Sequence, residues 1–316
     1  RLLGVSSLET RAARHAALDA DPVTRRNHLV ADAWCAAFLG PKTPDAVAIT
    51  DRVVNQVADG TADQSVLDAV HEIATRHRLF HWHLEFPDVF TVPDDGRADE
   101  TYGWTGGFDA MLGNPPWERV KLQEQEFFAS RAPDVADAKN AAARKKMIAA
   151  LEGSDRHALF VEFQATKRGS EAESHFLRLS GRYPLTGVGD VNTYQVFAEH
   201  FRASLDPTGR SGIITGLTGI LPDYPTAPFF ADTVLSARLA AFYDFENEAK
   251  IFAGVHNQFR FAITAMTGGE PVKDVALAFY TRFVVDVSQR RCQVSPDEVR
   301  LLNPHTGTLP VFRSRA

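Results

Sequence analysis

The stretch FDAMLGNPPW, residues 108–117, restricts the fold of this chain more than any other part of the sequence. It begins with a compact apolar run, which is typical of a short buried strand in an α/β sheet. Gly113 interrupts the run, and Pro115 and Pro116 prevent its continuation, because proline has no N–H to donate to a sheet ladder. The sequence therefore predicts a strand over Phe108–Asn114 that ends in a rigid turn, with Trp117 directly after it.

Composition restricts the class of protein. The chain has 316 residues, 44% of them hydrophobic and 23% charged, which suits one large or two modest globular domains. The net charge of -6 argues against a dedicated nucleic-acid binder, so any DNA contact must be local or come from a partner. Two cysteines, Cys35 and Cys292, argue against a disulfide scaffold and indicate a reducing cytoplasm. No apolar stretch has the length of a membrane span, so no membrane association is expected. The start at Arg1 suggests a piece of a longer protein.

Hydrophobic periodicity predicts helices over residues 7–80 and again over 118–179. Within the second region, DVADAKNAAARKKMIAALEG reads as one helix that ends at Gly153, with Ser154 as the cap of the next. The glycine-containing loop SGRYPLTGVGDVNTY leads into a further helix. Besides the first strand, the patterns predict strands over Gly212–Leu217, Leu239–Phe245, Gln258–Met266 and the stretch VALAFYTRFVVDV. Strands that alternate with helices indicate an α/β architecture with a largely parallel sheet.

The turn after the first strand suits methyl transfer to an exocyclic amine. The nitrogen lone pair of such an amine is delocalised into the base, so two acceptors aimed at its N–H bonds can help to free it. Asn114 offers a side-chain carbonyl and Pro115 a backbone carbonyl, both on a rigid turn. Trp117 can stack on a base extruded from a duplex, where the amine would otherwise be out of reach. A structural loop with a surface tryptophan is the alternative interpretation.

The sequence resembles the N6-adenine DNA methyltransferases of large restriction-modification and phage-defence systems, which use S-adenosylmethionine. The resemblance is carried by Asn114-Pro115-Pro116-Trp117 in GFDAMLGNPPWERVKLQEQEFFA and by further blocks over nearly the whole chain. Those blocks are ADAWCAAF, FHWHLEFPDVF, SGRYPLTGVGDVNTYQVFAE and FYDFENEAKIFAGVHNQFRF. It implies a partial Rossmann-like methyltransferase sheet with an N-terminal helical region and helical insertions.

The resemblance also implies roles for residues. Asn114, Pro115, Pro116 and Trp117 would be catalytic, and Trp117 with Tyr194 would form the pocket for the target base. Asp190 and Asn192 would lie near the S-adenosylmethionine cofactor, and no metal is implied. The partner would be double-stranded DNA with a flipped adenine.

Two departures from the family pattern accompany this resemblance. Nothing before Phe108 matches the family's cofactor motif, Asp-Pro-x-x-Gly-x-Gly, and residues 215–219 diverge from the Pro-Thr-Gly usual there. The chain therefore resembles the downstream part of a methylase, without the upstream half that holds the cofactor and without the recognition domain that follows. Three regions are expected: a helical region over 1–105, the catalytic part over 106–270, and the start of a target-recognition region over 271–316.

Two other functions remain open at this stage. One is methylation of a protein glutamine, whose amide nitrogen poses the same problem; the long insertions between Glu118 and Leu179 favour a DNA enzyme instead. The other is a catalytically silent module that needs a partner half. His81 and His83 alternate on one face but lack further ligands at metal-binding spacing, so packing is the favoured interpretation. Basic residues between 119 and 146 are interleaved with acids and suit a solvated face as well as phosphates. The stretch YDFEN follows a predicted strand, and its polar residues could belong either to a functional site or to the core of the fold.

Overall fold

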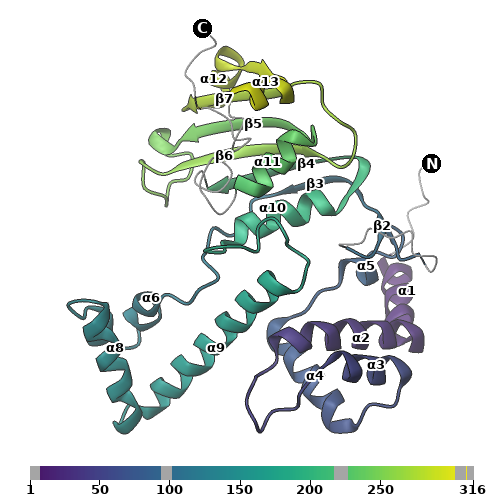
Figure 1. The fold of residues 1–316 in the computed structure, drawn as a ribbon, viewed down its shortest axis with the longest axis vertical. Helices are drawn as coiled ribbons and strands as arrows, with labels where there is room; N and C mark the ends of the chain where they lie inside the picture. Colours follow the sequence, from purple (N-terminus) through teal and green to yellow (C-terminus); the bar gives the residue numbers. More distant parts are fainter. Residues whose placement is uncertain (1–7, 94–101, 217–226, 303–310, 312–316) are drawn as a thin grey trace. The chain divides into compact units, whose positions relative to one another are not determined.

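The computed structural model describes residues 8–93, 102–216, 227–302 and 311 (Figure 1). The chain divides into two compact units, Arg1–Val92 and Pro93–Ala316.

The first unit is helical, as the sequence predicts. Asp21 caps α2 by accepting a hydrogen bond from the Thr24 N–H at 2.8 Å, and the helix ends at Gly40. The helix α2 packs against α3 and α4 (Figure 1). Small and branched side chains such as Ala36 and Val70 are buried in this unit. The elements of this unit are α1 (Leu8–Ala20), α2 (Pro22–Leu39), α3 (Asp51–Asp59), α4 (Gln64–His77), α5 (Trp82–Glu85) and β1 (Phe90–Thr91).

The second unit contains β2 (Thr105–Gly106) and a six-stranded sheet. The sheet holds all four of the strands that the sequence predicts to share it, which confirms that prediction; Leu217, the last residue of one of them, lies outside the described residues. The strands lie in the order β3 (Phe108–Gly113), β4 (Leu205–Gly216), β6 (Arg260–Thr267), β5 (Leu239–Glu246), β7 (Val275–Thr281) and β8 (Cys292–Val294).

The prediction of a largely parallel sheet was wrong. The strand β3 pairs with β4, and β5 with β7, in parallel, but β6 pairs antiparallel with both β4 and β5, and β8 antiparallel with β7. The loop that follows β5 turns the chain back into β6 with a short 3-10 helix, η3 (Asn247–Ala249), and no α-helix between the two strands. Because β3, β4, β5 and β7 run in the same direction, their carboxyl ends still meet at one edge of the sheet.

One face of the sheet is covered by α10 (Thr193–Ala203) and α11 (Ala227–Leu235). The core between them is aromatic and aliphatic, with Phe229, Phe230, Phe242 and Leu277 almost fully buried. Burial of this kind is the main stabilising contribution to such a unit. The α/β class and the helical region that precedes the sheet are confirmed.

The edge strand β3 and the opposite face of the sheet are less covered. Within the described part of the chain, β3 pairs on one side alone, with β4. Leu112 on this strand is 84% exposed, and Ile214 and Ile263 on neighbouring strands are partly exposed. An apolar strand residue this open to solvent is a candidate for a contact with another segment.

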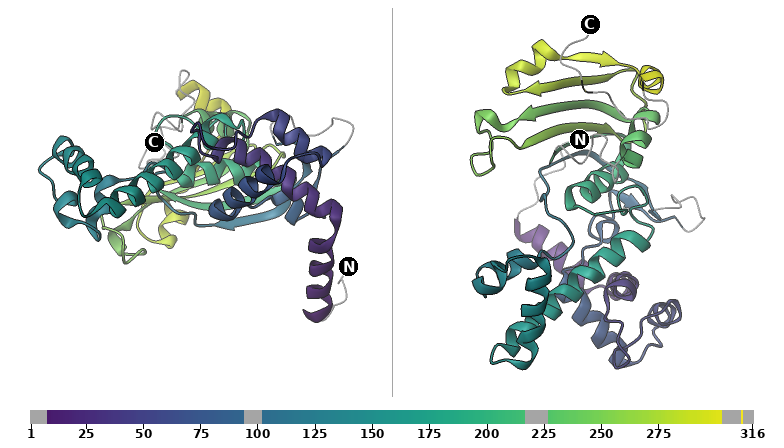
Figure 2. Two further views of the ribbon diagram at one scale, coloured as in Figure 1. Left: turned by 90° about the horizontal axis from the view of Figure 1, so that it is seen from below. Right: turned by 60° about the vertical axis from the view of Figure 1, so that its left-hand side comes forward.

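The helical insertion after the turn consists of several helices around one aromatic cluster. Phe127, Phe128 and Phe163 form its centre. The course of these helices can be followed in Figures 1 and 2. The elements are α6 (Glu124–Ala129), α7 (Pro133–Ala136), α8 (Ala141–Ala150), η1 (Leu151–Gly153) and α9 (His157–Leu179). The insertion predicted from the sequence is therefore confirmed.

Two details of the insertion differ from the prediction. The single helix expected to end at Gly153 is broken between α7 and α8, because the Asn140 side chain accepts a hydrogen bond from the Ala143 N–H at 2.9 Å and starts a new helix. Ser154 was predicted as a cap, but α9 begins at His157 with Arg156 in the cap position. The Ser154 hydroxyl instead accepts a hydrogen bond from the Arg156 N–H at 3.0 Å.

The last predicted strand is shorter than expected. The strand β7 ends at Thr281, and α12 (Val284–Arg290) follows at once. The Asp286 carboxylate accepts hydrogen bonds from the N–H groups of Arg282 and Phe283, both at 2.9 Å, which favours a helix start over an extended strand. The described chain continues through β8 to α13 (Pro296–Leu302), and η3 (Asn247–Ala249) follows β5.

Among the described helices, none combines the length and the apolar character that crossing a membrane would require.

Candidate functional site

The turn Asn114–Trp117 begins where β3 ends, at the edge of the sheet where the carboxyl ends of the parallel strands meet. A side chain at Gly113 would not fit, since an added Cβ would lie 2.9 Å from the ring of Phe201 on α10. Asn114 and Pro116 are exposed, Pro115 is buried and Trp117 is partly buried. The turn is thus anchored by one proline and presents the Asn114 amide to solvent.

Two hydrogen-bond acceptors of the turn are free. Among the described residues, neither the Asn114 side chain nor the Pro115 carbonyl has a hydrogen-bond partner. The Pro116 carbonyl, by contrast, accepts a hydrogen bond from the Thr193 hydroxyl at 2.6 Å. The two acceptors expected to bind an amine are therefore both left available by the described part of the fold.

The turn is tied to a segment more than 70 residues later in the chain. The Thr193 N–H donates to the Glu118 carbonyl at 2.9 Å, and the Glu118 N–H donates to the Thr193 hydroxyl at 3.1 Å. The Val120 N–H donates to the Val191 carbonyl at 3.1 Å. This short antiparallel contact brings the predicted catalytic turn next to the predicted loop over residues 190–194.

Asn192 and Asp190 play different parts in this loop. The Asn192 side chain caps α10, accepting from the Tyr194 N–H at 3.4 Å, while Gln195 accepts from the Asn192 N–H at 3.2 Å. Asp190 has a side chain 56% exposed, with Arg119 at 3.6 Å. Of the two residues predicted to bind a cofactor, Asp190 therefore has a carboxylate open to a ligand, and Asn192 has a structural role in the helix cap.

Trp117 and Tyr194 meet at the end of β4. A Cβ added to Gly216 would lie 3.8 Å from the Trp117 ring and 3.7 Å from the Tyr194 ring, so both rings pack beside this glycine. Two buried polar atoms here, the indole Nε1 of Trp117 and the hydroxyl of Thr215, have no hydrogen-bond partner among the described residues. A buried donor without a partner calls for an explanation, such as a water molecule or a ligand.

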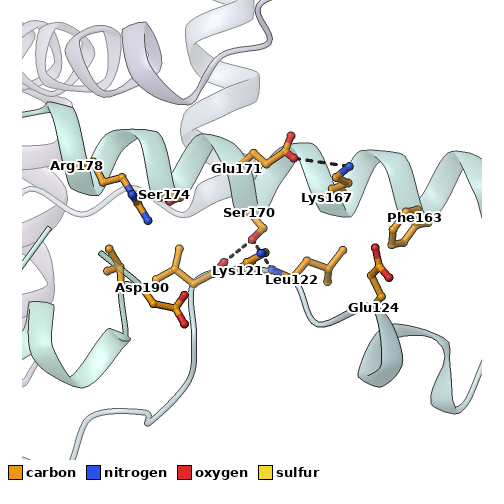
Figure 3. A pocket seen from close by; sticks show the side chains of 12 residues that line it. Lys121, Leu122, Glu124, Phe163, Lys167, Ser170, Glu171, Ser174, Arg178 and Asp190 are labelled. Carbon is orange, nitrogen blue, oxygen red and sulfur yellow. Dashed lines mark hydrogen bonds and ion pairs between the residues drawn. The ribbon is translucent and has the colours of Figure 1, made fainter. Parts of the chain in front are cut away.

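A cavity of about 260 Å³ lies beside this segment, between α9 and the chain on either side of the antiparallel contact (Figure 3). The Ser170 hydroxyl joins α9 to the segment on the other side of the cavity. It donates a hydrogen bond to the Val120 carbonyl and accepts one from the Leu122 N–H at 2.9 Å. Asp190 and Arg178 lie at one end and Glu124 and Phe163 at the other (Figure 3). Asp190 is the one predicted site residue in this lining; Asn114–Trp117 and Tyr194 lie outside it.

Sequence reasoning missed two residues that hold the site together. Thr193 joins the turn to the loop, as described above. Glu199 on α10 is fully buried and accepts from the Thr186 hydroxyl at 2.6 Å and from the N–H groups of Thr186 and Leu185 at 2.8 and 3.2 Å. Burial raises the pKa of Glu199 against these hydrogen bonds. A glutamate on the apolar face of a predicted helix was the signal that could have identified it.

The stretch YDFEN divides between core and loop. Asp244 is fully buried within β5, where Arg260 and the Tyr280 N–H contact its carboxylate. Asn247 is also fully buried and binds the loop that follows β5. In the first unit, His81 contacts Asp32 at 2.8 Å. Within the described ranges, no group of three or more histidine, cysteine, aspartate and glutamate side chains is placed to hold a metal ion.

The helix that carries Tyr194 is expected to give the fold a pH-dependent stability through His200. Burial, with the charge of Arg182 as a smaller cause, lowers the pKa of His200 to about 4 from an ordinary value of 6.5. The unfolded chain then binds more protons between these values, so His200 stabilises the fold above pH 6.5, and this contribution is lost as the pH falls toward 4. The loss is at most about 3 kcal/mol.

Urea unfolding at pH 7.5 and pH 5 measures this effect. The difference in the free energy of unfolding between the two pH values should shrink in His200→Gln and remain in His256→Gln, which alters an exposed histidine. An unchanged pH dependence in His200→Gln would contradict the assignment.

The described structure therefore defines an α/β protein whose candidate site is a proline-rich turn at the carboxyl edge of a sheet. Residues 41–164, which include this turn, match the family described as Eco57I restriction-modification methylase. The predicted resemblance to restriction-modification methylases is thus confirmed for the segment that carries Asn114–Trp117. No curated protein matches the chain.

Several solved structures are distantly similar to this chain. One is the modification subunit of a putative type I restriction enzyme from Vibrio vulnificus YJ016, with a TM-score of 0.36, 11% identity, and coverage of 61% of this chain and 34% of that one. Another is the type I restriction-modification methyltransferase subunit from Streptococcus thermophilus, with a TM-score of 0.36, 11% identity, and coverage of 90% and 58%. A third is a DrdV–DNA complex, with a TM-score of 0.32, 9% identity, and coverage of 61% and 18%. The chain thus spans less than two thirds of each of these proteins, and likenesses this distant assign no function.

Proposed function

We propose that this chain carries the base-binding side of a DNA methyltransferase that transfers a methyl group from S-adenosylmethionine to adenine N6, in restriction-modification or phage defence. The observation that carries the proposal is the turn Asn114–Trp117. It follows β3 at the carboxyl edge of the sheet, presents two free acceptors, and lies against Tyr194. A DNA methyltransferase would act in the cytoplasm, which suits the two free cysteines.

The proposed chemistry of the turn is electrostatic. The Asn114 side-chain oxygen and the Pro115 carbonyl would accept the two N–H bonds of the adenine amine and free its lone pair for the methyl group. Trp117 would stack on the flipped base, with the Tyr194 ring beside the same glycine, Gly216. The hydrogen bond from Thr193 to the Pro116 carbonyl would keep the turn rigid, so that both acceptors are aligned before the amine arrives.

We infer that the described residues supply only part of a binding site for S-adenosylmethionine. Asp190 offers an exposed carboxylate, but the Asn192 side chain is occupied by the cap of α10. The glycine-rich motif that the resemblance implies has no match before Phe108. We therefore place the main cofactor contacts on a missing upstream half of the methyltransferase.

The open side of the sheet supports this division. The free edge of β3 and the exposed Leu112 would be covered by strands of the upstream half, which would extend the sheet beyond β3. The acidic net charge of -6 agrees with recognition of double-stranded DNA mainly by other parts, including a downstream recognition domain. The same open edge favours a second candidate function, a catalytically silent module that binds a partner half.

Residues 1–316 alone are expected to bind S-adenosylmethionine at least about a hundredfold more weakly than the full-length protein, because most cofactor contacts are absent. They are also expected not to methylate DNA. Calorimetric titration with S-adenosylmethionine and tritium transfer to adenine-unmethylated genomic DNA measure the two properties. Nucleoside analysis of the product should give N6-methyladenine.

Three results would change this assignment. Micromolar cofactor binding by residues 1–316 would show that the site is more complete than proposed. Transfer to glutamine-containing peptides in place of DNA would indicate a protein methyltransferase. A full-length protein that binds cofactor and DNA but transfers no methyl group would favour the second candidate function, a catalytically silent module.

A further inference from the structure

Trp117 rests on a chain of aromatic rings that leads back into the sheet. Its ring lies 5.8 Å from the ring of Phe252 at an angle of 68°, so the two rings meet edge to face. Phe252 meets Phe261 in the same way at 4.8 Å and 89°. Phe261 stacks on Phe245 at 5.1 Å, and these two residues are almost fully buried cross-strand partners on β6 and β5. Phe252 therefore links the Trp117 ring to the buried aromatic pair on β5 and β6.

Phe252 belongs to the loop after β5, and one side chain holds this loop. Asn247 is fully buried, and its Oδ1 accepts a hydrogen bond from the Phe252 N–H at 3.0 Å. Its Nδ2 donates to the carbonyls of Phe252 and Val255, both at 3.0 Å. The oxygen and the nitrogen of the Asn247 amide thus form hydrogen bonds with the N–H and the carbonyl of Phe252. These bonds hold the backbone of Phe252, and so the starting point of its ring, in one position.

We propose that Phe252, held by Asn247, is a positioning residue that sets the orientation of Trp117 for stacking on the target base. The inference rests on the proposed function, because it assigns to Phe252 the support of the base-stacking ring. Edge-to-face aromatic contacts are directional, so loss of the Phe252 ring leaves Trp117 free to tilt. Neither Phe252 nor Asn247 need touch the base, and both act through Trp117.

The test separates the position of Trp117 from the reaction. Full-length protein labelled with 5-fluorotryptophan gives a fluorine resonance for Trp117, which is assigned by its loss in Trp117→Phe. This resonance should shift or broaden in Phe252→Leu and in Asn247→Ala. It should stay near its original position in Phe252→Tyr, which keeps the ring, and in Phe259→Leu, which alters an exposed aromatic side chain of the same loop.

Steady-state methylation of adenine-unmethylated genomic DNA provides the second readout. Phe252→Leu should raise the KM for DNA about three- to tenfold and leave kcat within about twofold, because the lost contact serves base capture. Phe252→Tyr and Phe259→Leu should keep the original KM. If Asn247→Ala fails to fold, Phe252→Leu carries the test, since it preserves the Asn247 hydrogen bonds to the backbone.

Each outcome decides one point. A Trp117 resonance that is unmoved in folded Phe252→Leu, or moved as much in Phe259→Leu, overturns the positioning role. A moved resonance with an unchanged KM also overturns it. If the unmodified full-length protein transfers no methyl group, the proposed function fails, and the resonance alone decides whether Phe252 positions Trp117.

Discussion

Replacing Asn114 with alanine is expected to reduce methyl transfer by the full-length protein at least about a hundredfold while leaving its DNA affinity unchanged. The exposed amide oxygen of Asn114 has no partner among the described residues, so its removal breaks no contact of the fold. The interaction that is lost is made mainly in the transition state, where the amine lone pair turns toward the methyl group. Removal of one preorganised group of this kind typically costs two to three powers of ten in rate.

Single-turnover methylation and a gel-shift titration measure the two quantities. Asn55→Ala is a matched control, because Asn55 is an exposed asparagine on α3 of the first unit. Trp117→Ala should have a smaller effect that acts mainly on the KM for DNA, since it removes stacking, worth about 1–3 kcal/mol per base. Near-normal turnover in Asn114→Ala would show that the amine is activated by other groups.

The features that could be predicted from the sequence are those with a local cause. The turn over residues 114–117 follows from two prolines that cannot continue a strand. The start of α10 follows from Asn192, whose side chain can cap a helix, and the end of α2 from Gly40. Such signals depend on the chain within a few residues, so they identify elements without knowledge of the rest of the fold.

The features that could not be predicted depend on long-range pairing. The apolar pattern of β6 predicts a strand but not its direction, and its place between β4 and β5 is set by the whole sheet. The hydrogen bond between Thr193 and the Pro116 carbonyl joins residues far apart in sequence. Phe252 likewise reads as an ordinary loop aromatic until its ring is found against Trp117. The sequence therefore identified the turn and a neighbouring loop, but not the residues that connect or support them.

Replacing Asp244 with alanine is expected to destabilise the fold by about 3–5 kcal/mol, because it leaves a largely buried arginine without its partner. Asp244 is fully buried in β5, and its Oδ2 accepts hydrogen bonds from the Arg260 guanidinium and from the Tyr280 N–H at 3.0 Å. Tyr280 has a φ of 56°, in the left-handed region, so this hydrogen bond also holds a strained backbone. The matched control is Glu270→Ala, which breaks an exposed pair with Arg210 at 2.9 Å and should cost at most about 1 kcal/mol.

Asp244→Asn should cost much less than Asp244→Ala, and it should change the pH dependence of stability. Burial raises the pKa of Asp244 above its ordinary value of 3.8, against the opposing effects of the Tyr280 N–H and Arg260. A carboxyl group with a raised pKa in the folded state stabilises the fold below its unfolded pKa, and this contribution is lost as the pH rises through the folded pKa. Asparagine keeps an acceptor for Tyr280 and cannot ionise, so urea unfolding of Asp244→Asn should lose that decline above pH 4. An equal loss of stability in both variants would mean that the charge of Asp244, more than its hydrogen bonds, holds β5, β6 and β7 together.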